Sequence, residues 1–189
     1  DSSALLYSLA QSEDWRIGLL VDEAHNLVDR ARGMYSASLT SRDLNGLRGL
    51  VPAPLKAAVS RLRKTWNALL ENKPAGFAEI DPDDALSNAL DNFIARTTDY
   101  LADHADLASP AVMDLYFSAL QWTRLVATFG DHSLCTLTRT EGEKAVRLTG
   151  GALAIRNVVP ASFVAPRLEA AEAVVLFSAT LQPQSYYAD

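Results

Sequence analysis

Two adjacent carboxylates, Asp22 and Glu23, directly follow the apolar run 17–21 (IGLLV) and precede His25. An aliphatic strand that ends in two carboxylates can present a metal ion and a water molecule to a phosphate. In such a site the first carboxylate binds Mg²⁺ and the second orients or deprotonates the attacking water. A simpler interpretation is that Asp22 is the N-cap of a helix that follows. The apolar strand in front of the pair favours the nucleotide-hydrolysing site.

A second segment of the same kind lies near the other end of the chain. Residues 173–181 (AVVLFSATL) form an apolar, β-branched run that ends in Ser178 and Thr180. Such a run is typical of a strand buried on both faces of a parallel sheet. We therefore expect two buried strands, each followed by polar side chains at its carboxyl end.

The pair of motifs, DEAH at 22–25 and SAT at 178–180, resembles motifs II and III of the superfamily-2 helicases. The resemblance implies that both strands lie side by side in one RecA-like sheet, parallel, with residues 19–21 beside 174–176. It also implies the residue roles. Asp22 would coordinate Mg²⁺, Glu23 would activate water, and both would contact ATP. His25 would connect this site to Ser178 and Thr180.

The distance between the motifs points to a subfamily. About 150 residues separate the two strands, which is the size of a domain, whereas a parallel crossover needs only a dozen or so. A helical insert at this place resembles the Arch domain of the XPD/DinG group of DNA helicases. The segments 1–6 (DSSALL), 156–160 (RNVVP) and 166–171 (PRLEAA) look like that group's approaches to motifs II and III. The resemblance implies motor-domain pieces at 1–25 and 151–189 and an Arch-like insert at 26–150.

We expect a mainly α fold, with three or more long helices and a β-hairpin flanked by strands of a RecA-like motor domain. Apolar spacing predicts a helix at 55–70. The signals Asp81-Pro82 and Ser109-Pro110 each predict an N-cap followed by proline at the first helical position, and the second helix should end at Gly130. The remaining expectations are a loop at 73–80 and a hairpin of 132–139 and 144–149 joined by 140–143.

Composition sets limits on partners. Hydrophobic residues make up 49% and charged residues 21% of the 189 residues, and no apolar run approaches the roughly 20 residues that a membrane span needs. We therefore expect no membrane partner. The single cysteine, Cys135, excludes an internal disulfide and fits a reducing compartment. With the resemblance, this implies a bacterial cytoplasm and association with the nucleoid.

The formal net charge of −6 is the wrong sign for a surface that binds DNA over its whole extent. Any contact with nucleic acid must therefore involve a local basic patch, and residues 56–64 hold the basic cluster. Arg61 and Lys64 share one side of the predicted helix and are the candidate contacts, although a solvated face is the simpler interpretation. Trp66 and Trp122 fall on apolar stripes and are expected in the core, away from DNA bases.

One further group of side chains resembles a metal site. Asp99, Asp103, His104 and Asp106 lie close together in the sequence. Asp99 and Asp103 are one turn apart, but His104 would point about 100° away from Asp103 on a helix. We therefore interpret the group as the solvated end of a helix.

The resemblance implies an ATP-dependent DNA helicase that moves along single-stranded DNA, generally 5′ to 3′, with the insert enclosing the strand. The chain contains no Gly-x-x-x-x-Gly-Lys-Ser/Thr phosphate loop, so we expect it to be inactive as an ATPase on its own. Relatives carry an iron–sulfur cluster, but Cys135 alone cannot hold one, so its ligands would lie outside this chain. Two alternatives are an insert that docks a protein partner and a DEAH-type RNA helicase. The long insert counts against the RNA helicase.

Overall fold

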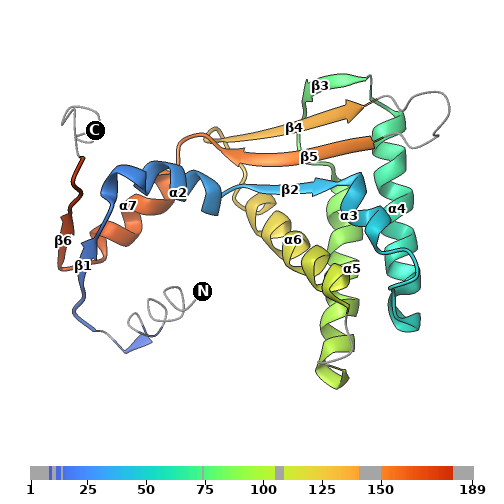
Figure 1. The fold of residues 1–189 in the computed structure, drawn as a ribbon, viewed down its shortest axis with the longest axis horizontal. Helices are drawn as coiled ribbons and strands as arrows, with labels where there is room; N and C mark the ends of the chain where they lie inside the picture. The colour runs from blue at the N-terminus through green and yellow to red at the C-terminus, as the bar shows by residue number, and fades with distance from the viewer. Residues whose placement is uncertain are drawn as a thin grey trace. The chain divides into compact units, whose positions relative to one another are not determined.

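The computed structural model describes residues 9, 12–13, 15–73, 75–104, 109–140 and 150–180, and these form a mixed α/β structure (Figure 1). The chain divides into two compact units. Asp1–Met34 and Val159–Asp189 together form the first, here called the motif unit. Tyr35–Val158 forms the second, here called the insert unit.

The motif unit is built on two parallel strands from opposite ends of the sequence. β1 (Gly18–Val21) pairs with β6 (Ala173–Leu176), with Leu19 opposite Val174 and Val21 opposite Leu176. The expected parallel arrangement and register are thus confirmed. The unit also contains the short 3₁₀ helix η1 (Ala24–Asn26), α2 (Leu27–Met34) and α7 (Ala161–Glu169).

A four-stranded antiparallel sheet forms one layer of the insert unit. Its order is β2 (Ala37–Thr40), β5 (Gly150–Asn157), β4 (Ser133–Thr140) and β3 (Gly76–Glu79). The long central strands β4 and β5 pair over their full length, from Ser133 opposite Asn157 to Thr140 opposite Gly150.

Helices form the second layer and cover one face of this sheet (Figure 1). The three long helices expected from the apolar spacing are α4 (Lys56–Glu71), α5 (Asp84–Asp103) and α6 (Pro110–Val126). α5 contacts both α4 and α6, and the shorter α3 (Ser41–Gly46) and η2 (Ala53–Leu55) complete the layer. No helix among the described residues is long and apolar enough to cross a membrane.

The core lies between the helices and the sheet. Trp66 and Trp122 are buried there, as expected, and the indole N–H of Trp66 donates to Ser41 Oγ at 2.9 Å. Alternate residues of the central strands face the helices, which fits the two-residue period of a strand. The fully buried side chains include Leu62, Leu70, Leu86, Leu90, Phe93, Leu115, Leu137, Leu153 and Ile155.

The predicted loop at 73–80 and the predicted hairpin were wrong in part. Gly76–Glu79 is strand β3, because it pairs with β4. On its other side, β4 pairs with β5. The strand expected at 144–149 and the turn residues 141–143 lie outside the described residues. The insert therefore contains a sheet, and the fold is mixed α/β, with more strand than a mainly α fold.

The start of α5 also differs from the prediction. Asp83 is the N-cap, and its carboxylate accepts a hydrogen bond from the Leu86 N–H at 2.7 Å. Asp81 does not cap the helix because the preceding residue, Ile80, still donates its N–H to the Cys135 carbonyl and so continues the sheet. The Ser109 cap of α6 is confirmed, but that helix ends at Val126.

The two compact units meet at 34/35 and 158/159, where the predicted domains met at 25/26 and 150/151. Pairing explains the second difference, because β5 is bonded to both β4 and β2 as far as Asn157 and so belongs to the insert unit.

The cap assignment generates a prediction about stability. Asp83→Ala should lower the free energy of unfolding by about 1 kcal/mol, because it removes the acceptor for a helix N-terminal N–H. Asp81→Ala, which makes the same change two residues earlier, should have a clearly smaller effect. Urea denaturation followed by circular dichroism measures both, and an equal loss in the two variants would contradict the assignment.

Candidate nucleotide site

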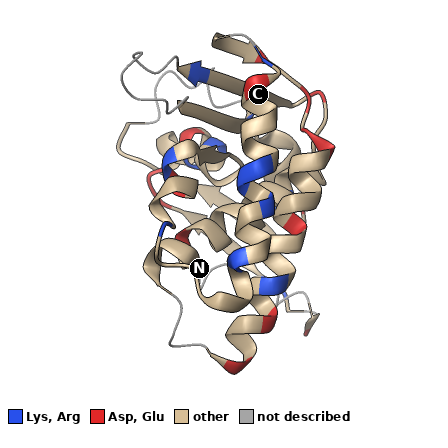
Figure 2. Ribbon diagram, turned by 90° about the vertical axis from the view of Figure 1, so that its right-hand side faces the viewer, with Lys and Arg blue, Asp and Glu red and all other residues tan. Residues whose placement is uncertain are grey.

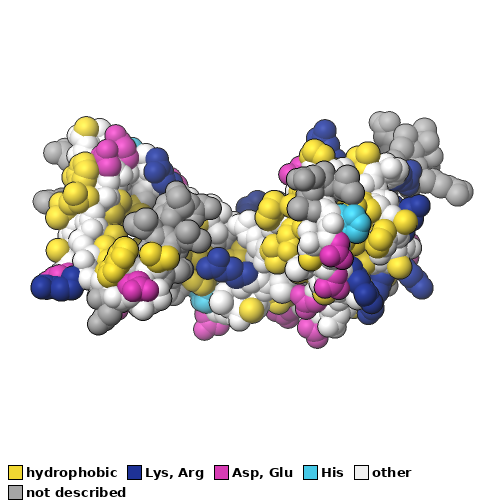
Figure 3. Space-filling view, turned by 90° about the horizontal axis from the view of Figure 1, so that it is seen from below, with side chains coloured by type: hydrophobic (Ala, Val, Ile, Leu, Met, Phe, Trp, Pro, Cys, Tyr) yellow, Lys and Arg dark blue, Asp and Glu magenta, His cyan; other side chains and the backbone are white. Residues whose placement is uncertain are grey.

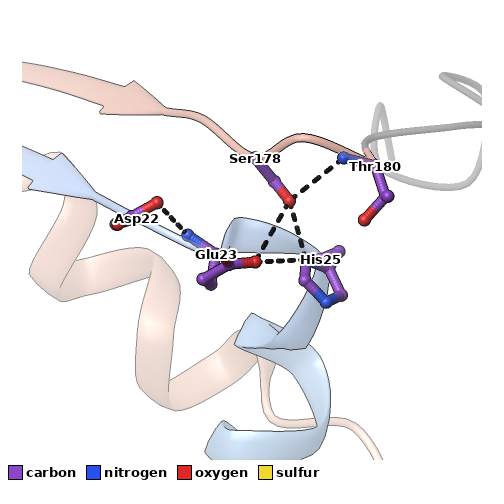
Figure 4. Close-up of polar contacts among 5 residues, drawn as sticks. All are labelled: Asp22, Glu23, His25, Ser178 and Thr180. Atoms are coloured by element: carbon purple, nitrogen blue, oxygen red, sulfur yellow. Dashed lines mark hydrogen bonds and ion pairs between the residues drawn. The ribbon is translucent and has the colours of Figure 1, made fainter.

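The polar residues of both motifs meet at the carboxyl ends of β1 and β6 (Figure 4). Main-chain hydrogen bonds continue the pairing beyond the strands. The Phe177 N–H donates to the Val21 carbonyl at 3.0 Å, and the Ala24 N–H donates to the Phe177 carbonyl at 3.1 Å. Because parallel strands place both carboxyl ends at one edge, these bonds bring the residues after β6 beside those after β1.

Glu23, His25 and Ser178 form a connected cluster at this edge. Nδ1 of His25 lies 2.7 Å from Ser178 Oγ and 3.1 Å from Glu23 Oε2. The Ser178 hydroxyl and Glu23 Oε2 are 3.5 Å apart, and the Thr180 N–H donates to Ser178 Oγ at 3.3 Å. The structure therefore brings together four of the residues expected at the site, Thr180 through its main chain.

Glu23 has a backbone conformation that its side chain disfavours. Its φ of 54° and ψ of 42° lie in the left-handed region, and it is the one described non-glycine residue with a positive φ. This conformation costs roughly 1–2 kcal/mol. It persists because the peptide on each side is bonded, the Glu23 N–H to Asp22 Oδ1 at 2.7 Å and the Glu23 carbonyl to the Asn26 N–H at 2.9 Å. Such strain held by neighbours is a feature of functional sites.

Asp22 has the chemistry of a magnesium ligand. It is exposed at the end of β1, and its second carboxylate oxygen has no protein partner among the described residues. Mg²⁺ is usually held by one or two carboxylates, with phosphate oxygens and water as the other ligands. Asp22 with Glu23 beside it fits this requirement. No group of three or more His, Cys, Asp or Glu in the described part of the chain could hold a metal by itself.

The cluster does not have the geometry of a serine nucleophile. In a Ser–His–acid triad, serine contacts Nε2 of the histidine and the acid contacts Nδ1. Here Ser178 and Glu23 both approach Nδ1 of His25. The histidine therefore cannot take a proton from Ser178 at one nitrogen while Glu23 holds the other. The arrangement instead lets His25 connect the Glu23 carboxylate to the Ser178 hydroxyl through one nitrogen.

Two residues that contribute to this site were not anticipated from the sequence. Arg16 and Glu172, which precede β1 and β6, form a two-bond ion pair, with Arg16 Nε donating to Glu172 Oε2 at 2.7 Å. Their opposite charges just before two paired strands could have revealed the contact. The pair is exposed and so contributes little stability, but it favours the register that aligns the two motifs.

The basic cluster divides into exposed and structural residues. Arg61, Lys64 and Lys56 are exposed on α4. Arg63 is half-buried, and its guanidinium donates to the Leu44 carbonyl at 2.7 and 3.1 Å, near the end of α3. Positive charge at a helix C-terminus is favourable. Arg63 therefore stabilises the insert unit.

The remaining candidates lie in the insert unit. Asp99 and Asp103 are exposed near the end of α5, and the His104 ring stacks on Tyr100 with centroids 4.8 Å apart. Asp106 lies outside the described residues. Cys135 is buried in β4, and burial, together with the charge of Asp81, raises the pKa of its thiol to about 11.

No model of a protein family matches the chain, and no curated protein is similar to it at a significant level.

The buried thiol leads to a prediction. At pH 8 a thiol of pKa about 11 is about one part in a thousand thiolate, and Cys135 is also shielded, since 1% of it is exposed. A maleimide or disulfide reagent should therefore modify the folded protein more than about a hundredfold slower than the protein in urea. Equal rates, followed by absorbance or mass spectrometry, would show that Cys135 is accessible.

Proposed function

We propose that the motif unit forms part of the ATP-hydrolysing site of a DNA helicase that resembles the XPD/DinG group. The observation that carries the proposal is the contact among Glu23, His25 and Ser178, all within 3.5 Å of one another. These residues come from segments about 150 positions apart in the chain. If the resemblance to both motifs were due to chance, these three residues would have no reason to lie in contact.

Each side chain has a role in this proposal. Bound Mg²⁺ would neutralise charge on the phosphates, and Asp22 would hold it. Glu23 would orient the attacking water and accept its proton, since a carboxylate is a suitable acceptor in phosphoryl transfer. The left-handed backbone at Glu23 turns its carboxylate out of the line of β1 and toward His25. The strain thus serves to aim the proposed base.

His25 and Ser178 would report the state of the site to the segment after β6. Ser178 accepts the Thr180 N–H, so a shift of its hydroxyl changes the main-chain bonding of the SAT segment. A hydrogen bond of 2.7 Å between His25 and Ser178 is short enough to couple the two residues.

The exposure of the strands supports a position within a larger sheet. Leu20 is 75% exposed and Val175 is 51% exposed, although parallel strands are normally covered on both faces. Apolar residues at these places are expected where further strands or helices of a RecA-like domain cover them. A phosphate-binding loop, which the chain lacks, would then belong to that same sheet.

In this proposal the insert unit helps to enclose single-stranded DNA. A second candidate role is docking of a protein partner, which the exposed apolar side chains of α6 favour. Phe117 is 59% exposed and Leu120 is 38% exposed, three residues apart on one side of the helix. Exposed apolar groups of this kind mark interaction surfaces when they are contiguous.

The proposal is tested by substitution of the water-activating carboxylate in the intact protein that joins this chain to a phosphate loop. Glu23→Gln should lower DNA-stimulated ATP hydrolysis by about 10²–10⁴-fold, because it removes the proton acceptor and keeps the side-chain size. Glu169→Gln, which neutralises an exposed carboxylate on α7, is the matched control and should leave the rate unchanged. Release of phosphate measures both. A Glu23→Gln enzyme with the rate of the unsubstituted protein would refute the assigned role.

A further inference from the structure

Acidic and basic residues are unevenly distributed along the insert unit, which the net charge of −6 for the whole chain does not show. Residues 41–73 contain seven basic and two acidic residues, a net charge of +5. Residues 79–106 contain eight acidic residues and one basic residue, a net charge of −7. The first segment forms α3, η2 and α4, and most of the second forms α5. Positive charge is therefore concentrated in the part of the unit that holds α3 and α4.

The cations of this segment are largely exposed to solvent. Five of them are exposed to solvent: Arg42, Arg48, Lys56, Arg61 and Lys64. None of the five forms a salt bridge within the described residues, where the ion pairs are those of Arg16, His25 and Arg32. α3 lies beside α4, since Arg63 reaches from α4 to the Leu44 carbonyl. Figure 2 faces this side of the insert unit and shows Lys and Arg following one another along a helix. In the insert unit, Figure 3 shows dark blue side chains toward the right-hand edge and magenta side chains next to them.

The side chains between these cations indicate the class of partner. On the exposed side of α4, Arg61 and Lys64 are accompanied by small or uncharged residues, namely Ala57, Ser60, Asn67 and Ala68. Protein interfaces are centred on aromatic or large apolar residues. The exposed side of α4 has none, and segment 41–73 exposes one, Leu50, after α3. Contacts to phosphates need no apolar centre. The face therefore fits a polyanion better than a folded protein.

The composition of this face also favours a duplex over a single strand as the nucleic-acid partner. Surfaces that hold single strands combine positive charge with aromatic rings on which bases stack. The one aromatic residue of α4, Trp66, is 2% exposed and is bonded to Ser41, so it offers no ring. A surface that contacts phosphates alone gains more from a duplex, because binding there releases more counterions per phosphate. α4 is a straight element of 16 residues, about 24 Å long, which can follow a duplex backbone.

We infer that the exposed basic face of α3 and α4, with Arg61 and Lys64 at its centre, binds the phosphate backbone of duplex DNA. The proposed function assigns the insert to a single strand, so this contact goes beyond it. In a helicase the contact would place the insert against the double-stranded region next to the strand that the motor holds. It is independent of the nucleotide site.

The inference is tested with the 189-residue chain and fluorescent DNA of about 20 base pairs, or the matching single strand, across about 50–200 mM KCl. Anisotropy should show tighter binding to the duplex. Arg61→Ala/Lys64→Ala should weaken duplex binding about tenfold at low salt and reduce the slope of log affinity against log salt by about two, one for each lost phosphate contact.

Two control variants isolate the face from net charge. Arg124→Ala/Arg156→Ala removes the same charge from exposed residues of α6 and β5 and should bind like the unsubstituted chain. Arg61→Lys/Lys64→Arg keeps the charge and should also bind normally, and circular dichroism verifies that every variant is folded.

Three results would overturn the inference. One is a single strand bound as tightly as the duplex. Another is equal weakening by the Arg124/Arg156 and Arg61/Lys64 pairs. The last is displacement of the duplex by poly-glutamate at equal charge concentration, which would indicate an acidic protein partner. None of these results would change the ATPase of the Glu23→Gln protein, so the two proposals fail separately.

Discussion

The parallel pairing of β1 with β6 is the constraint on which the rest of this chain depends. The contacts of Ser178 with Glu23 and His25 follow from it, because Val21 opposite Leu176 leaves Glu23 and Ser178 at the same edge. A shift of one residue would turn the side chains of β6 to the opposite face of the sheet. The exposed strands bury little surface, so the register is held chiefly by main-chain bonds on either side, from Glu172 to Ile17 before the strands and from Phe177 to Val21 after them.

A long insertion between two paired strands is tolerated only if its ends can lie close together. The insert unit meets this condition through its own sheet. β2 begins two residues after the unit starts and β5 ends one residue before the unit ends, and the two strands pair with Ala37 opposite Ile155. Antiparallel neighbours are about 5 Å apart, so the sheet brings both ends of the insert together. The entropy of closing this long connection is then largely offset by folding within the insert.

The residues that could be predicted from the sequence are those whose signal is local. The two apolar strands are examples, since each is continuous and followed by hydroxyl or acidic groups. The Ser109-Pro110 cap is another, because cap and proline act within one turn. The strands β3 and β5 were missed because long-range pairing sets them, and β5 begins with two glycines. A Cβ at Gly151 would lie 2.4 Å from the Leu70 side chain, so a larger residue there would require Leu70 to shift.

The residues of the site could be predicted from the sequence, but their geometry could not. The motifs name Glu23, His25 and Ser178, but no local rule gives a glutamate a positive φ or directs Glu23 and Ser178 to the same nitrogen of His25. That shared nitrogen has a chemical consequence. A neutral imidazole with its proton on Nδ1 has one N–H there, which can be directed well at either Glu23 or Ser178.

The Ser178 hydroxyl can itself donate to Glu23, at 3.5 Å, so the three groups have two hydrogen-bonded arrangements. When Glu23 is free, its charge attracts the His25 proton. Under the proposed function, a water molecule and a phosphate would occupy Glu23, and the proton would then be better directed at Ser178, whose oxygen also holds the Thr180 N–H. In the proposed function, this exchange would convert the occupancy of a carboxylate into a change in the main chain after β6. The exchange of hydrogen bonds itself requires only the rotation of side chains.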